Sequence, residues 1–196
     1  MSGTEIKLML ISFVWVLGLT RILECFAALW VARKRVRFVA SQILWMTAIL
    51  IDILGNWLGV ASFSNNSSIW MFVDMLLYSI GMFFAAVVVS PRIPAEGVLD
   101  LAVYETEEGA AYKITFIVLM LLALPAEYGQ LAADFGTVPV ALYLKVSWST
   151  FVTLVVFAAG LTRNTRIRTG AAFAALLLAI YGLAINLVFM AMGGPR

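Results

Sequence analysis

Six apolar runs dominate this sequence, and their length constrains the fold more than any other feature. A helix needs about 20 mainly apolar residues to cross the roughly 30 Å of hydrocarbon in a bilayer. The runs that meet this requirement are about 8–31, 38–61, 69–90, 114–135, 138–161 and 171–192. Because lipid offers no partner to backbone N–H and C=O groups, each run must be helical. The sequence therefore predicts an all-α, polytopic transmembrane helix bundle with six spans, forming a single domain over residues 1–196.

The composition indicates the same environment. Hydrophobic residues make up 63% of the 196 residues and charged residues 12%. A soluble domain has about half apolar and about a quarter charged residues. A water-soluble fold of this size cannot bury so much apolar surface, so we expect the lipid bilayer to surround the chain.

The basic residues between the predicted spans indicate an orientation. Nine of them fall in the first, third and fifth connections: Arg33, Lys34, Arg35, Arg37, Arg92, Lys113, Arg163, Arg166 and Arg168. The positive-inside rule places such connections in the cytoplasm. With an even number of spans, both termini then face outward. We expect a multi-pass protein of a bacterial cytoplasmic (inner) membrane.

Several function classes are excluded by what the sequence lacks. The net charge of +2 gives no case for nucleic acid, which requires clustered basic residues. Histidine is absent, and with it the commonest metal ligand and the usual proton shuttle near neutral pH. The single Cys25 forms no internal disulfide. We therefore expect no catalytic residues, no metal and no cofactor, and not an enzyme.

Charged residues within the predicted spans are the candidate site. They are Arg21, Glu24, Asp52, Asp74, Glu127 and Lys145. Each costs about 2.5–3.5 kcal/mol at the centre of a membrane helix, so we expect them to face the bundle interior. Arg21 and Glu24 stand three residues apart, a spacing that favours an intrahelical ion pair.

The other four charged residues lie on four different predicted helices, in a shared depth band. Asn56 stands one turn after Asp52, and Tyr78 one turn after Asp74, so each acid has a polar neighbour on its own helix face. One interpretation is an ion or proton site formed by Asp52, Asp74 and Glu127, with Lys145 as counter-ion. The other is a buried ion-pair network that fixes helix packing. Both stay open at this point.

The longest connection, 91–113, opens with Pro91 and Pro94 and then becomes acidic. Its carboxylates are Glu96, Asp100, Glu105, Glu107 and Glu108. The position of Thr106 before two acids is typical of a helix start. We expect a cytoplasmic loop lying on the membrane surface, and the alternative is a loop that docks a partner.

Two stretches resemble a group of small, uncharacterised bacterial inner-membrane proteins. The first is Leu17-Gly18-Leu19-Thr20-Arg21-Ile22-Leu23, followed by Ala28-Leu29-Trp30 and the basic run from Arg33 to Arg37; the second is Pro91, Pro94, Gly97, Leu99-Asp100-Leu101 and Tyr104. The resemblance implies that Arg21, Pro94 and Asp100 belong to the group's pattern. It implies no activity, because the group has none assigned. The acidic stretch 105–108 departs from the basic one typical of that group, so no shared partner is implied there.

These observations predict an integral membrane protein that is a non-enzymatic component or accessory subunit, as a homo-oligomer or with a membrane-protein partner. The alternative is an ion- or proton-coupled small-solute transporter or channel that uses the intramembrane carboxylates.

Overall fold

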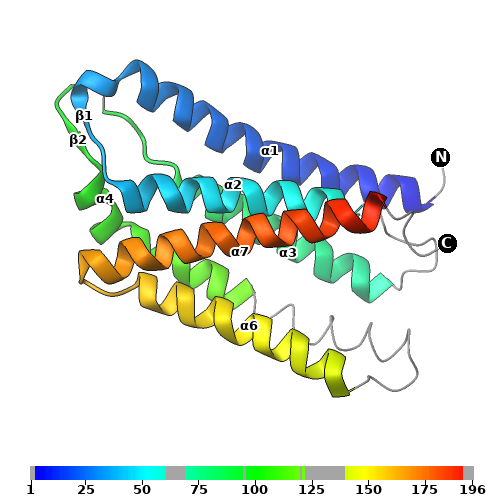
Figure 1. Cartoon of the computed structure of the whole chain (residues 1–196). Coiled ribbons are helices and arrows are strands. Elements are labelled where there is room, and N and C mark those ends of the chain that lie inside the picture. Colours follow the sequence, from blue (N-terminus) through cyan, green and yellow to red (C-terminus); the bar gives the residue numbers. More distant parts are fainter. Residues whose placement is uncertain (1–2, 61–68, 95, 120, 122–139, 192–196) are drawn as a thin grey trace.

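The fold is a bundle of helices with a two-stranded sheet at one end. The computed structural model describes residues 3–60, 69–94, 96–119, 121 and 140–191. In chain order the elements are α1 (Gly3–Val31), the 3-10 turn η1 (Arg33–Arg35), β1 (Val36–Arg37), α2 (Ala40–Val60), α3 (Ile69–Val89), β2 (Leu99–Asp100), α4 (Leu101–Glu107), α6 (Val140–Gly160) and α7 (Thr165–Ala191). A further helix, without a label in Figure 1, covers Gly109–Leu119. The predicted all-α class is confirmed.

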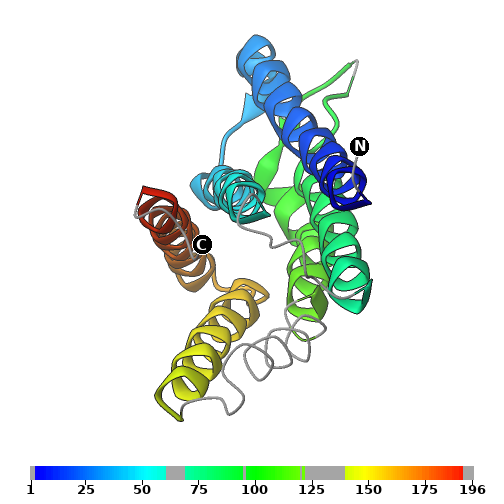
Figure 2. The same ribbon diagram turned by 90° about the vertical axis from the view of Figure 1, so that its right-hand side faces the viewer.

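The long helices run side by side, with α2 at the centre. Figure 1 places the beginning of α1 and the end of α7 at one end of the bundle, and β1, β2 and α4 at the other. The view along the bundle in Figure 2 shows α2 between α1, α3 and α7, and α2 contacts all three. We call the end that carries β1, β2 and α4 the sheet end.

Three described helices are long and apolar enough to cross a membrane. They are Glu5–Val31, Ala40–Leu58 and Thr165–Val188. Shorter apolar stretches of described helix are Met75–Val89 within α3, Thr150–Gly160 within α6, and the helix Gly109–Leu119. The length and composition of the three long helices suggest a membrane protein.

Burial on α1 follows one stripe of the helix. Its buried residues succeed each other at intervals of three or four: Ile11, Trp15, Gly18, Ile22, Cys25 and Leu29. This spacing is typical of a helix that packs along a single face. The outward face exposes large apolar side chains, including Met9 and Phe13, which are compatible with lipid but costly in water.

Helix boundaries differ from the predicted ones mainly at polar ends. The final predicted span began at residue 171, whereas α7 begins at Thr165. The side-chain oxygen of Asn164 accepts a hydrogen bond from the backbone N–H of Arg166 at 3.0 Å, which satisfies one of the free donors at the helix start. Most of the predicted span 114–135 lies outside the described residues.

The connection 91–113 is more structured than the predicted surface loop. β2 pairs in parallel with β1, with Val36 opposite Leu99 and Arg37 opposite Asp100. The Asp100 side chain then accepts hydrogen bonds from the backbone N–H groups of Ala102 and Val103, capping α4.

The predicted helix start at Thr106 is therefore wrong. Thr106 lies near the end of α4, and its hydroxyl donates back to the carbonyls of Ala102 and Val103. The capping carboxylate is supplied by Asp100, six residues earlier in the sequence than Thr106.

Candidate functional site

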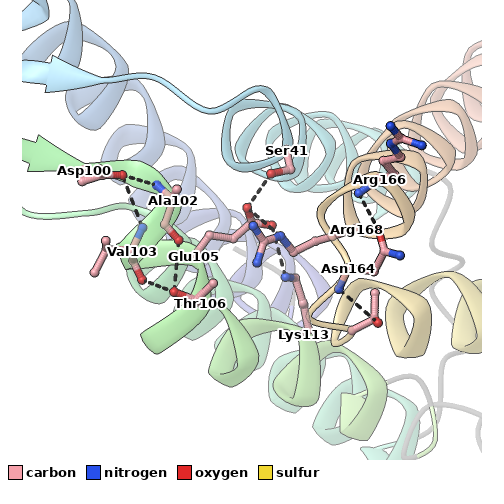
Figure 3. Close-up of polar contacts among 11 residues, drawn as sticks. Ser41, Asp100, Ala102, Val103, Glu105, Thr106, Lys113, Asn164, Arg166 and Arg168 are labelled. Carbon is pink, nitrogen blue, oxygen red and sulfur yellow. Dashed lines mark hydrogen bonds and ion pairs between the residues drawn. The ribbon is translucent and has the colours of Figure 1, made fainter.

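A charged network lies buried at the sheet end and is centred on Glu105. The side chain of Glu105 is 0% exposed, that of Lys113 2% and that of Arg168 5%. Lys113 Nζ lies 3.4 Å from Glu105 Oε1, and Arg168 Nε lies 3.1 Å from Oε2. The Ser41 hydroxyl donates to the same Oε2, and Figure 3 shows the three side chains converging on one carboxylate.

Four elements meet in this network. Ser41 comes from the first turn of α2, Glu105 from α4, Lys113 from the helix Gly109–Leu119 and Arg168 from the first turn of α7. Two cations share one carboxylate, so each buried charge has an opposite charge in direct contact. The geometry fastens four chain segments together.

Aromatic side chains enclose Lys113. Its Nζ lies 5.4 Å from the ring centroid of Trp45 and 5.2 Å from that of Tyr112, a distance typical of cation–π contacts. Burial lowers the pKa of Lys113, and the charge of Glu105 acts in the opposite direction. Burial also raises the pKa of Tyr112 well above its ordinary value, and Glu105 adds to that effect.

Sequence reasoning missed this network because it assigned Glu105, Lys113 and Arg168 to exposed connections. The basic residues that are exposed at this end number seven: Arg33, Lys34, Arg35, Arg37, Arg92, Arg163 and Arg166. One signal was available. Leu101, Glu105, Gly109 and Tyr112 recur at intervals of three or four, which places Glu105 on the apolar face of a helical repeat, and all four are buried.

A second polar group lies within the bundle, at Asp52 on α2. The Tyr78 hydroxyl of α3 is 3.4 Å from Asp52 Oδ2, and the Asn56 side chain donates to the Asp52 backbone carbonyl at 2.8 Å. The structure thus brings together three of the predicted site residues. The side chains of Asp74, Glu127 and Lys145 lie outside the described ones. Among the ion pairs between described residues, none includes Asp52.

Asp52 lines a partly open cavity of about 100 Å³ between the helices. The wall is formed by α2, α6, α7 and the helix Gly109–Leu119, and includes Asp52, Phe116, Thr153, Phe157, Ala175 and Ala179. This volume is large enough for several waters or for a ligand of a few atoms.

Aromatic rings lie between the cavity and the Glu105 network. The rings of Phe116 and Phe157 are stacked in parallel with centroids 4.1 Å apart. Trp45, which contacts Lys113, packs against Phe157 at 4.7 Å. Gly160 makes room for this indole, because a Cβ there would come within 2.7 Å of Trp45 Cζ2.

Arg21 contacts a residue that is distant in the sequence, and not the predicted partner Glu24. Arg21 Nη2 donates to the backbone carbonyl of Ser90 at 3.3 Å, and Glu24 is exposed on α1. No ion pair between described residues joins Arg21 to Glu24. A cation is favoured here because Ser90 directly follows the C-terminus of α3, where free carbonyls and the helix dipole concentrate negative charge.

Within the described residues, no group of three or more Asp, Glu, Cys or His side chains is arranged to hold a metal ion. No protein family, curated protein or solved structure matches this chain.

Proposed function

We propose that the chain crosses a bacterial cytoplasmic membrane six times, with both termini outward. Two arrangements support this. The beginning of α1 and the end of α7 lie at one end of the bundle, as an even number of crossings requires. The exposed basic residues of η1 and of the turn between α6 and α7 lie at the sheet end, and the positive-inside rule assigns that end to the cytoplasm.

We infer that the protein is an ion- or proton-coupled carrier or channel for a small solute, and that Asp52 is its binding group. The observation that carries this proposal is the position of Asp52 on a cavity between the helices without a cationic partner among the described residues. A carboxylate that no described cation pairs with is costly within a membrane helix, so we infer that a proton or a bound cation neutralises the group.

These two forms of neutralisation are mutually exclusive and therefore coupled. When a monovalent cation enters the cavity, the protonated carboxyl releases one proton and becomes the carboxylate that holds the cation. The charge at the site is the same before and after the exchange. Cation movement in one direction can therefore drive proton movement in the other.

A second candidate is a non-enzymatic membrane component or accessory subunit, as a homo-oligomer or with a membrane-protein partner. The Glu105 network favours it, because four segments fastened by buried charges form a rigid sheet end. In neither candidate does the protein act as an enzyme or require a cofactor.

Liposomes containing the full chain and an internal pH dye distinguish the two candidates. Outward gradients of sodium, potassium and small alkylammonium ions are imposed in turn. We expect at least one of them to drive proton uptake or release that is lost in Asp52→Asn and retained in Glu24→Gln, a control that removes an exposed carboxylate on α1. The absence of any Asp52-dependent proton movement would refute the carrier and favour the structural component.

A further inference from the structure

We propose that the cavity at Asp52 selects a small tertiary alkylammonium ion, of the size of trimethylammonium, over an alkali-metal ion. This inference rests on the proposed cation site at Asp52 and names its ligand class.

The volume of the cavity fits a ligand of a few atoms. A dry apolar cavity of about 150 Å³ in a protein accommodates benzene, which corresponds to about 25 Å³ per heavy atom. The cavity of about 100 Å³ therefore holds about four heavy atoms. Trimethylammonium has that number, whereas drug-sized ligands occupy pockets of about 300 Å³ or more.

The wall does not suit a bare metal ion. Hard cations take about six or more oxygen ligands. Among the described side chains that line the cavity, Asp52 supplies a carboxylate and Thr153 a hydroxyl, and the others are apolar. A metal ion would have to retain most of its hydration shell, against walls that are mostly apolar.

The wall does suit a cation that is mostly apolar. A tertiary ammonium has one N–H donor, which a single carboxylate can accept in a charge-assisted hydrogen bond. Its methyl groups would contact the rings of Phe116 and Phe157 and the side chains of Ala175 and Ala179, which remove them from water. Aromatic rings also attract such cations.

The described groups that face Asp52 are neutral, so among them no cation offsets the charge of its carboxylate. On α2, the Asn56 side chain donates to the backbone carbonyl of Asp52 at 2.8 Å and also contributes a neutral hydrogen bond to the carboxyl group. On α3, Tyr78 contributes a neutral hydroxyl at 3.4 Å. On α6, Thr153 contributes a neutral hydroxyl, and the cavity-lining side chains of α7 and of the helix Gly109–Leu119 are apolar. Binding should therefore weaken at low pH, where a proton occupies Asp52.

Calorimetric titration of the full chain in lipid nanodiscs tests the inference. The probes are the chlorides of trimethylammonium, tetraethylammonium and sodium. We expect trimethylammonium to bind at one site at least about tenfold more tightly than either of the other ions. Neither of them can donate the charge-assisted hydrogen bond to Asp52, and tetraethylammonium is also larger than the cavity. Proton release, measured in weak buffer, should accompany binding.

Variants test separately the contributions of the Asp52 charge and of the cavity volume to binding. Asp52→Asn removes the charge, and Ala179→Leu fills the cavity while leaving Asp52 in place; each should weaken trimethylammonium binding by at least about tenfold. Glu24→Gln is the matched control and should bind as the unaltered chain does. If Asp52→Asn fails to fold, Ala179→Leu and Ala175→Leu, which fills the cavity from the same helix, decide the question.

Two outcomes would overturn the inference. One is equal affinity for trimethylammonium and the larger tetraethylammonium, and the other is undiminished binding in the cavity-filling variants. If sodium causes Asp52-dependent proton release while trimethylammonium does not bind, the ligand class is wrong and the cation site stands. If no cation causes Asp52-dependent proton release, both proposals fail.

Discussion

Replacing Glu105 by glutamine should destabilise the protein more than replacing any exposed acid. Glu105→Gln keeps the shape of the side chain and a carbonyl that can accept from Ser41, but it removes the charge that Lys113 and Arg168 share. Two buried cations are then left without a counter-ion.

The magnitude follows from the burial of all three charges. Removing one member of a buried ion pair costs about 3–5 kcal/mol, because the remaining charge is desolvated and uncompensated. For a chain of about 200 residues, 1 kcal/mol lowers the melting temperature by about 2–4 °C. We therefore expect Glu105→Gln to lower it by about 6–20 °C.

Thermal unfolding in detergent, followed by circular dichroism, measures this loss. Glu107→Gln is the control, because Glu107 lies on the same helix and is exposed, and it should change the free energy of unfolding by no more than about 0.5 kcal/mol. The double variant Glu105→Gln, Lys113→Met should recover part of the loss, since one unpaired cation is removed with its partner. A melting temperature for Glu105→Gln equal to that of Glu107→Gln would refute the reasoning.

Three further predictions concern single positions. Asp100→Ala removes the cap of α4 and should lower the free energy of unfolding by about 1 kcal/mol in thermal melts, whereas Asp100→Asn, which keeps a capping oxygen, should lose less. Burial raises the pKa of Tyr104 from 10.0 to about 12. The contribution of this shift to the free energy of unfolding is therefore complete below pH 10 and is lost as the pH rises through about 12. Ultraviolet titration of tyrosinate should show the ionisation of Tyr104, and Tyr104→Phe should remove both this ionisation and the fall in stability. Gly160→Ala should lower the free energy of unfolding by about 1–3 kcal/mol, because the added Cβ would clash with Trp45. The Cβ of Gly170→Ala would meet no atom within 4 Å, so this variant should be as stable as the unaltered chain or slightly more stable. Melting temperatures of the two variants give the comparison.

The helices were predictable because their signal is local. A run of apolar residues carries its own evidence for a membrane helix, and α2, α3 and α6 begin and end within two residues of the predicted ranges. That Asp52 and Asn56 are neighbours was equally predictable from the sequence, because one helical turn separates them.

The ion pairs were not predictable from spacing because they join distant segments. Ser41 and Glu105 are 64 residues apart, and Arg21 reaches the carbonyl of Ser90 across 69 residues. Sequence spacing favoured Glu24 as the partner of Arg21, but the end of α3 offers a carbonyl acceptor at that depth. Tertiary contacts of this kind follow from helix packing, which a single sequence does not determine.

The exchange of a proton for a cation at Asp52 is the central claim, and infrared difference spectroscopy tests it most directly. Trimethylammonium is added to the reconstituted protein, and the carboxyl bands are compared before and after. We predict that a protonated-carboxyl band disappears and a carboxylate band appears, and that both changes are absent in Asp52→Asn and present in Glu24→Gln. A spectrum in which trimethylammonium, sodium and potassium all leave the carboxyl bands unchanged would contradict the account.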